Sequence, residues 1–271
     1  MKTAIIIAGG TRQVNLAHKF WDKLPTGDLF YSTWDLSNTA HSNILYSAES
    51  EIKDLTSKVN FKAVFVSDYK NEYLNSKMTS FQRPFYLLNK VRQHIKDQEY
   101  QRVIYFRPDL KLFYLDNYNP ETEFDVDDKS IKLLGLHHNP EEFLDETNRT
   151  MNDTFFVFSW SVFELLLDSA KYICDREIHN SLFEFFKYHG IKINPITNMR
   201  CVILRENINE SNINLGIYEL TELFMTVFNE TLGMRKSFPR NEYIFQDKKL
   251  IDFEYLERSR NNGGILKLRN K

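Results

Sequence analysis

The first part of the chain alternates short apolar runs with segments whose apolar residues recur at helical spacing. The run TAIIIA at residues 3–8 is apolar after its first position, which is typical of a strand buried on both faces of a parallel sheet. Similar runs occupy residues 29–34, 62–66 and 102–113, the last with a charged interruption, and helical patterns separate the runs. Strands that alternate with helices need crossover connections. The sequence therefore predicts an α/β fold with a mostly parallel central sheet flanked by helices.

Polar residues interrupt or follow each of these runs. They form four groups, at residues 9–12, 32–35, 67–68 and 107–109. The carboxyl ends of parallel strands meet at one edge of a sheet, and ligands of α/β proteins bind beyond that edge. We therefore expect the four polar groups to contribute to one site.

The composition narrows the class of protein. Of 271 residues, 42% are hydrophobic, and the net charge is −2, which argues against a surface built throughout to coat nucleic acid. Two cysteines provide neither a disulfide framework nor the spacing of a zinc site. The sequence shows no signal peptide and no long apolar segment, so we expect a cytoplasmic protein that does not insert into a membrane.

Two parts of the chain differ in their pattern of predicted strands and helices. Residues 1–210 carry the strand and helix alternation and are predicted to form the main ligand-binding domain, and residues 211–271 are predicted to be a helical extension with a basic tail. The extension opens with the helical pattern YELTELFMTVFNETL at residues 218–232. The basic residues of the tail are Arg235, Lys236, Arg240, Arg258, Arg260, Lys267 and Arg269.

The first strand ends in the sequence AGGTR, which comprises Ala8, Gly9, Gly10, Thr11 and Arg12. A glycine pair lets the backbone approach a ligand closely, and the amides that open a following helix attract anions. The guanidinium of Arg12 suits a phosphate group. The segment matches neither the dinucleotide-binding glycine pattern nor a P-loop, so a purely structural tight turn is the alternative interpretation.

The triplet Arg107-Pro108-Asp109 interrupts the fourth apolar run. A buried, unpaired charge is costly, so both charged side chains are expected at the end of a strand, facing a pocket. There Asp109 is a candidate ligand for Mg²⁺ or Mn²⁺, and Arg107 a candidate partner for a diphosphate. An ion pair between the two that closes a loop is the alternative.

Three further acidic residues are candidates for catalysis. Asp153 precedes the aromatic part of a strand predicted in the segment MNDTFFVFSW, where a carboxylate suits sugar hydroxyls or simply caps the strand. Glu177 and Glu184 lie seven positions apart on one helical pattern, so they project on similar sides. Either is a candidate general base if it faces the site. A solvated helix surface explains both equally well.

Five segments occur in an informative order, namely IIIAGGTR, DLFYSTWD, FQRPFYLLNKV, VIYFRPDLKL and MNDTFFVFSWSVFE. This order resembles a divergent group of GT-A-like glycosyltransferases found in bacteriophages, giant viruses and bacterial polysaccharide loci. The resemblance covers about residues 4–165. It implies a Rossmann-like GT-A fold that binds a nucleotide sugar.

The resemblance also implies roles for individual residues. The segment from Ala8 to Arg12 would approach the nucleotide, Asp35 and Gln82 would line the donor pocket, and Asp153 would lie on the side of the acceptor or the donor sugar. Asp109 would be the last acid of the metal-binding D-x-D motif. Arg107 replaces the first acid of that motif, so a guanidinium can take the place of Mn²⁺ or Mg²⁺ in neutralising the diphosphate.

The expected activity is transfer of a sugar from a nucleotide sugar, with UDP-sugar as the expected donor, to an acceptor hydroxyl. The acceptor is either a glycan or a hydroxymethylated base in phage duplex DNA, and a phage enzyme would act in the host cytoplasm. The basic residues of the tail would then bind DNA. One alternative is a non-catalytic nucleotide- or glycan-binding protein of the same fold. A nucleotidyltransferase is another, although its glycine-rich motif is incomplete here.

Overall fold

An eight-stranded sheet in the order β5-β2-β1-β6-β11-β8-β12-β7 lies at the centre of the chain. The computed structural model describes residues 1–38, 45–76, 82–136, 144–145, 150–151, 153–173, 178–205, 207–223, 242–244, 250–252 and 267–269. The strands of the central sheet are β1 (Thr3–Ala8), β2 (Asp28–Trp34), β5 (Ala63–Ser67), β6 (Arg102–Phe106), β7 (Leu110–Tyr114), β8 (Ser130–Leu136), β11 (Phe155–Ser159) and β12 (Lys192–Ile203).

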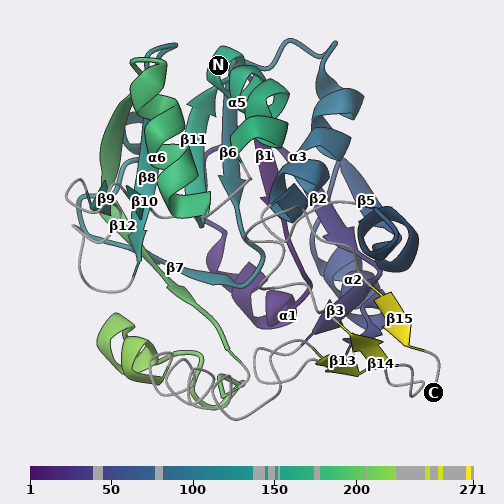
Figure 1. The fold of residues 1–271 in the computed structure, drawn as a ribbon. Helices are drawn as coiled ribbons and strands as arrows, with labels where there is room; N and C mark the ends of the chain where they lie inside the picture. The colour runs from purple at the N-terminus through teal and green to yellow at the C-terminus, as the bar shows by residue number, and fades with distance from the viewer. Residues whose placement is uncertain are drawn as a thin grey trace.

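Most strands of this sheet run in the same direction. The neighbours β5, β2, β1 and β6 are parallel, and so are β8 and β12. Only β11 and β7 run opposite to their neighbours. Figure 1 shows β1 and β6 side by side in the middle of the sheet. The predicted α/β fold, with a mostly parallel sheet flanked by helices, is confirmed.

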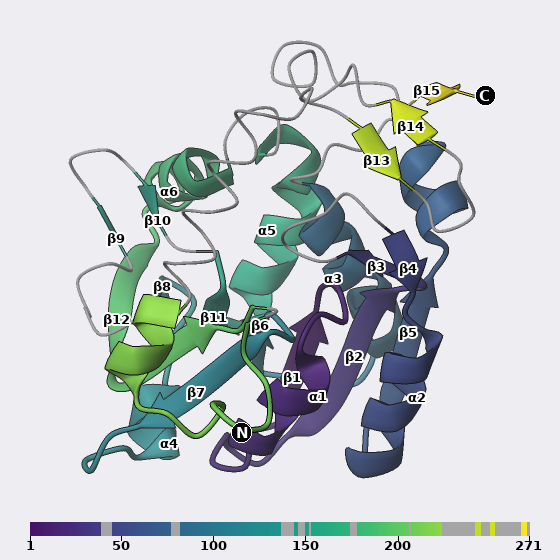
Figure 2. The ribbon, with the colours of Figure 1, turned by 90° about the horizontal axis from the view of Figure 1, so that it is seen from below.

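Helices cover both faces of the sheet. One face carries α3 (Gln82–Ile95), α5 (Trp160–Ile173) and α6 (Ile178–Tyr188), and the other carries α1 (Val14–Ala17), the 3₁₀ helix η1 (His18–Phe20) and α2 (Glu49–Lys58), as Figure 2 shows. Successive residues of a strand point to opposite faces. Ile6 therefore joins the apolar cluster under α3, whereas Ile7 joins the one under α1. Burial on both faces explains why β1 is an uninterrupted apolar run.

The run at residues 102–113, predicted as one interrupted strand, forms two separate strands. β6 lies between β1 and β11, whereas β7 lies at the edge of the sheet beside β12. The chain leaves β6 at the triplet Arg107-Pro108-Asp109. Proline has no N–H group to donate to a neighbouring strand, so it favours an end to strand pairing at this point.

The helix predicted after β1 is shorter than its pattern. Only Val14–Ala17 is α-helical, and the next turn tightens to the 3₁₀ helix η1, where the Trp21 amide donates to the carbonyl of His18. The remaining short elements are β3 (Leu36–Asn38), β4 (Leu45–Ser47), a π-helix η2 (Tyr69–Leu74), α4 (Pro120–Glu123), β9 (Leu144–Asp145) and β10 (Thr150–Met151).

The extension predicted from residue 211 onward contains both helix and strand. Residues 217–223 are helical, and Leu220 belongs to the apolar cluster under α1. The later strands β13 (Glu242–Ile244), β14 (Leu250–Asp252) and β15 (Lys267–Arg269) form a small antiparallel sheet. The domain boundary at residue 210 stays a prediction. Within the described residues, no helix combines the length and apolar character that spanning a bilayer requires.

Candidate functional site

Several charged segments meet at one edge of the central sheet. The parallel strands β1, β2, β6 and β12 end at this edge, and the opposed strands β11 and β7 begin there. The topology therefore gathers residues that lie far apart in the sequence. We call the following four residues the Asp109 cluster: Arg12, Arg107, Asp109 and Arg205.

The turn after β1 packs directly on the end of β6. Gly9 has φ +151°, and a Cβ at this position would lie 2.8 Å from Cδ of Pro108. The Gly9 amide donates to the carbonyl of Ser32 at 3.1 Å, which ties the turn to β2 as well. A residue with a side chain would separate the two strand ends, so glycine is needed for this close approach. At Gly10 the nearest atom to a Cβ would be Oγ of Ser37, at 3.5 Å.

Asp109 is the centre of the cluster. Its Oδ1 accepts from Nε of Arg107 at 3.0 Å and its Oδ2 from Nη2 of the same side chain at 2.7 Å, while Nη1 of Arg205 lies 3.5 Å from Oδ2. Burial alone would raise the pKa of Asp109, but the charges of Arg107, Arg12 and Arg205 outweigh it and hold the pKa below its ordinary value. Asp109 is therefore ionised at neutral pH.

Asp153 lies next to Arg107 at the start of β11. The Arg107 amide donates to the carbonyl of Thr154, the residue after Asp153, at 3.1 Å. Burial would lower the pKa of Arg107, yet the charges of Asp109 and Asp153 raise it above its ordinary value. The structure thus brings Asp153 together with the predicted Arg107 and Asp109.

Arg205 is a member of the cluster that sequence reasoning missed. It follows β12, and the amide of the preceding Leu204 donates to the Asp109 carbonyl at 2.7 Å. Gln13 binds the same segment, because its Nε2 donates to the carbonyls of Arg205 at 2.8 Å and Ile208 at 3.2 Å. The signal was present in the sequence: MRCVILREN places an arginine directly after an apolar run, as at the other strand ends.

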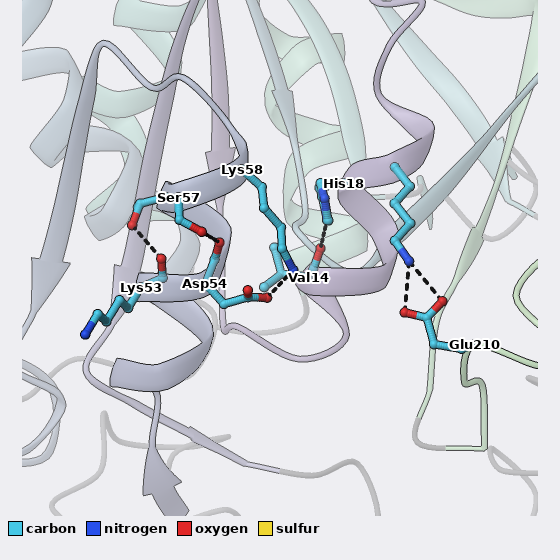
Figure 3. A network of polar contacts seen from close by, with 9 residues as sticks. Val14, His18, Lys53, Asp54, Ser57, Lys58 and Glu210 are labelled. Carbon is cyan, nitrogen blue, oxygen red and sulfur yellow. Dashed lines mark hydrogen bonds and ion pairs between the residues drawn. The ribbon is translucent and has the colours of Figure 1, made fainter.

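The segment that carries Arg205 is held by two lysines. Nζ of the buried Lys111 donates to the carbonyls of Ile213 at 2.6 Å and Leu215 at 3.0 Å. Burial lowers the pKa of Lys111 to about 8. Lys19 of η1 pairs with Glu210 at 2.9 Å, and Glu210 is labelled in Figure 3. The segment after β12 thereby contacts η1 and β7.

A second group of predicted residues lies around Asp35, at the ends of β2 and β5. Oδ1 of Asp35 accepts from the Tyr69 amide at 2.7 Å, and the hydroxyl of Tyr69 lies 3.3 Å from Nη1 of Arg83. Gln82, the first residue of α3, directly precedes Arg83. Asp35 is thus linked through Tyr69 to Arg83, the residue after Gln82, and β3, which begins after Asp35, carries the Ser37 that borders Gly10.

Two hydroxyl groups in this region are buried without a partner. Oγ1 of Thr11 and Oγ of Ser37 have no hydrogen-bond partner among the described residues. A buried hydroxyl without a partner is costly. Thr11 lies between Gly10 and Arg12 in the predicted ligand-binding turn, so a bound polar ligand or a water molecule can relieve that cost.

Of the two predicted glutamates, Glu184 lies away from the Asp109 cluster. Glu184 lies on the exposed side of α6, whose buried residues Phe183 and Phe186 pack on the face of the sheet opposite α1. Glu177 lies outside the described residues. Of the basic tail, Lys267 and Arg269 begin and end β15, and the other five residues lie outside the described part of the chain.

No protein-family model matches the sequence, and no curated protein matches it either. Among solved structures, an active-site mutant of LgtC is similar at 9% identity and a TM-score of 0.44, covering 71% of this chain and 72% of that chain. Galactosyltransferase LgtC in complex with donor and acceptor sugar analogs is similar at 11% identity and a TM-score of 0.41, with the same coverage. Mouse xyloside xylosyltransferase 1 shows 14% identity and a TM-score of 0.38, covering 70% of this chain and 82% of that chain.

Proposed function

We propose that this chain is a glycosyltransferase that takes its sugar from a nucleotide sugar, with a UDP-sugar as the expected donor. The observation that carries the proposal is the Asp109 cluster, in which three arginines converge beside the glycine turn at the end of β1. Guanidinium groups bind phosphate oxygens in pairs, and ligands of α/β sheets bind at this edge. A dianionic diphosphate matches such a site in both charge and position.

The neighbouring residues supply the remaining parts of a donor site. The backbone at Gly9 and Gly10 approaches the nucleotide, and the unpartnered hydroxyls of Thr11 and Ser37 provide polar groups for it. In this proposal the region around Asp35 and the start of α3 at Gln82 receives the nucleoside. Ser37, on the strand that follows Asp35, borders the turn after β1 at Gly10.

Glycosyl transfer needs a group that accepts the proton of the acceptor hydroxyl. Of the three acidic residues predicted as further candidates, Asp153 acts electrostatically on Arg107, Glu184 is exposed on α6 and Glu177 lies outside the described residues. We therefore assign the role of general base to Asp153. The transition state resembles an oxocarbenium ion, so a carboxylate beside the reacting sugar also stabilises developing positive charge.

The acceptor is either a hydroxyl of a glycan or a hydroxymethylated base in phage duplex DNA, and the phage version acts in the host cytoplasm. The affinity for duplex DNA, measured across a series of salt concentrations, distinguishes the DNA acceptor from the glycan acceptor. Neutralised phosphates release counterions, so affinity for DNA must fall steeply as salt rises. Binding that is absent or insensitive to salt eliminates the DNA acceptor and leaves the glycan.

Thermal unfolding in the presence of nucleotide sugars tests the proposed donor. A ligand that binds only the native state stabilises it, by about 2.7 kcal/mol at a concentration one hundred times its Kd. We expect UDP- or GDP-sugars to raise the Tm more than CMP-sugars, because CMP-sugars carry a single phosphate. Release of nucleoside diphosphate from the stabilising donor then measures turnover.

Two results would contradict the proposal. If no nucleotide sugar raises the Tm, the donor class is wrong. If a nucleotide sugar binds but is neither transferred nor hydrolysed, the chain is the alternative, a non-catalytic nucleotide- or glycan-binding protein.

A further inference from the structure

The Asp109 cluster occupies the place at which a GT-A-like enzyme is expected to hold a divalent cation, so its donor atoms decide whether a metal ion fits. Mg²⁺ and Mn²⁺ favour several oxygen ligands, carboxylates above all. Both oxygens of Asp109 already accept from Arg107, at 3.0 and 2.7 Å, and Arg205 lies 3.5 Å from one of them. Among the described residues, no three His, Cys, Asp or Glu side chains gather to hold a metal ion. These donor atoms do not fit a divalent cation.

The same residues fit an anion. Among these five described side chains, three guanidinium groups face two carboxylates, Asp109 and Asp153, which leaves an excess of one positive charge. The side chain of Asp109 is 3% exposed, whereas those of Arg107 and Arg205 are 25% and 15% exposed. The guanidinium groups of Arg107 and Arg205 are therefore more accessible to an incoming ligand than the carboxylate of Asp109.

We propose that the three arginines of the Asp109 cluster bind the diphosphate of the donor directly, without a divalent cation. Asp109 is then a positioning residue that fixes the guanidinium of Arg107 through two hydrogen bonds and holds Arg205 beside it. This inference rests on the proposed function and adds to it the means by which the leaving group is neutralised.

The atoms and charges of the glycosyl-transfer step balance without a metal ion. The bond between the anomeric carbon and the diphosphate oxygen breaks, and its electron pair stays on that oxygen. The acceptor oxygen forms the new bond to the anomeric carbon and loses its proton to the carboxylate base. The negative charge that develops on the diphosphate is stabilised by the three guanidinium groups, which already lie in place before the bond breaks.

Calorimetric titration of the full chain with inorganic pyrophosphate tests this inference. The titration is made once in EDTA and once with Mn²⁺. We expect binding in EDTA, with a Kd that Mn²⁺ does not lower. Binding that appears only with Mn²⁺ would overturn the inference and would leave the proposed glycosyl transfer intact.

Variants show where pyrophosphate binds. Arg205→Gln removes one guanidinium, and we expect it to weaken pyrophosphate binding in EDTA by about tenfold or more. Arg92→Gln is the matched control, since Arg92 also pairs with two carboxylates, Glu164 at 3.4 Å and Asp168 at 2.7 Å, and is 22% exposed, but lies on α3. Equal affinities of these two variants would overturn the inference.

Asp109→Asn separates a positioning role from metal binding. Asparagine keeps one acceptor oxygen for Arg107 and removes the charge that a cation would need. We expect this variant to bind pyrophosphate more weakly than the wild type in EDTA, because only one of the two hydrogen bonds that position Arg107 remains, and Mn²⁺ should not lower its Kd. If Mn²⁺ tightens binding to the wild type and not to the variant, Asp109 is a metal ligand and the inference is wrong. Wild-type binding in EDTA without turnover of any nucleotide sugar would keep the anion site and overturn the proposed function.

Discussion

Asp109 is a buried carboxylate that interacts with the guanidinium groups of three arginines. Its removal leaves guanidinium groups facing one another with no negative charge between them. Breaking a buried ion pair by removing one partner typically costs about 3–5 kcal/mol. We therefore expect Asp109→Ala to lower the free energy of unfolding in urea by an amount in this range.

The control is an acidic residue whose ion pair is exposed. Asp54 pairs with Lys58 at 2.7 Å within α2, where both side chains are exposed, and Figure 3 shows the two labelled residues on this helix. Such a pair contributes less than about 1 kcal/mol, so Asp54→Ala should change the stability little. Similar losses in the two variants would show that the Asp109 cluster contributes no more to stability than a surface ion pair.

Lys111 gives the stability a pH dependence whose sign follows from its burial. Its native pKa is lowered to about 8, against an ordinary value of 10.5. Between these two values unfolding takes up a proton, so the contribution of Lys111 to stability rises with pH across that window. We expect the free energy of unfolding of the wild type, relative to Lys111→Met, to rise by at most about 3 kcal/mol across it. Urea unfolding of both proteins at several pH values measures this difference in free energy. A difference that stays constant or falls as the pH rises would contradict the prediction.

At the residue scale, the sequence predicted three of the charged residues that the structure brings together around Asp109, because they interrupt or follow apolar runs near the N-terminus. Arg12, Arg107 and Asp109 were predicted by this rule, and the same rule applies to Arg205. The prediction stopped short of Arg205 because the partner strand of β12 cannot be read from a single sequence. Its proximity to Asp109 depends on the pairing of β12 with β7.

The turn between β1 and α1 is the element on which the site depends most. Gly9 combines a positive φ with a 2.8 Å approach to Pro108, so a methyl group there forces β1 and β6 apart. We expect Gly9→Ala to destabilise the fold by about 1–3 kcal/mol and to weaken pyrophosphate binding as well. Thermal unfolding and calorimetry check the two effects.

Gly10→Ala separates this effect from a general intolerance of side chains in the turn. A Cβ at Gly10 would make only an ordinary contact with Ser37, at 3.5 Å, so the unfolding temperature should stay close to that of the wild type. If Gly9→Ala is equally well tolerated, the close packing of the two strand ends does not matter for the fold.

At the element scale, the strands were easier to predict than the connections. The apolar runs marked β1, β2, β5 and β6 because burial on both faces leaves little room for polar residues. The split of the run at residues 102–113 into β6 and β7 was missed, since both halves are equally apolar and only pairing distinguishes them. The helix after β1 was overestimated because its helical spacing continues into residues that form a 3₁₀ turn.

At the scale of the whole molecule, the fold class follows from the alternation of strand and helix patterns along the sequence. Strand and helix patterns in sequence order were enough to predict the α/β class and the edge at which polar segments gather, because crossover connections bring parallel strand ends together. The antiparallel placement of β11 and β7 and the strands of the tail were not predictable in this way. These pairings depend on contacts between segments distant in the sequence.

The central claim is that distant strand ends form one diphosphate site. A crystal structure of the full chain with a bound nucleotide sugar tests it most directly. We predict that the diphosphate lies within hydrogen-bonding distance of the guanidinium groups of Arg12, Arg107 and Arg205, with Asp109 still paired to Arg107. A nucleotide sugar bound at another face, with none of these arginines in contact with its phosphates, would contradict the claim.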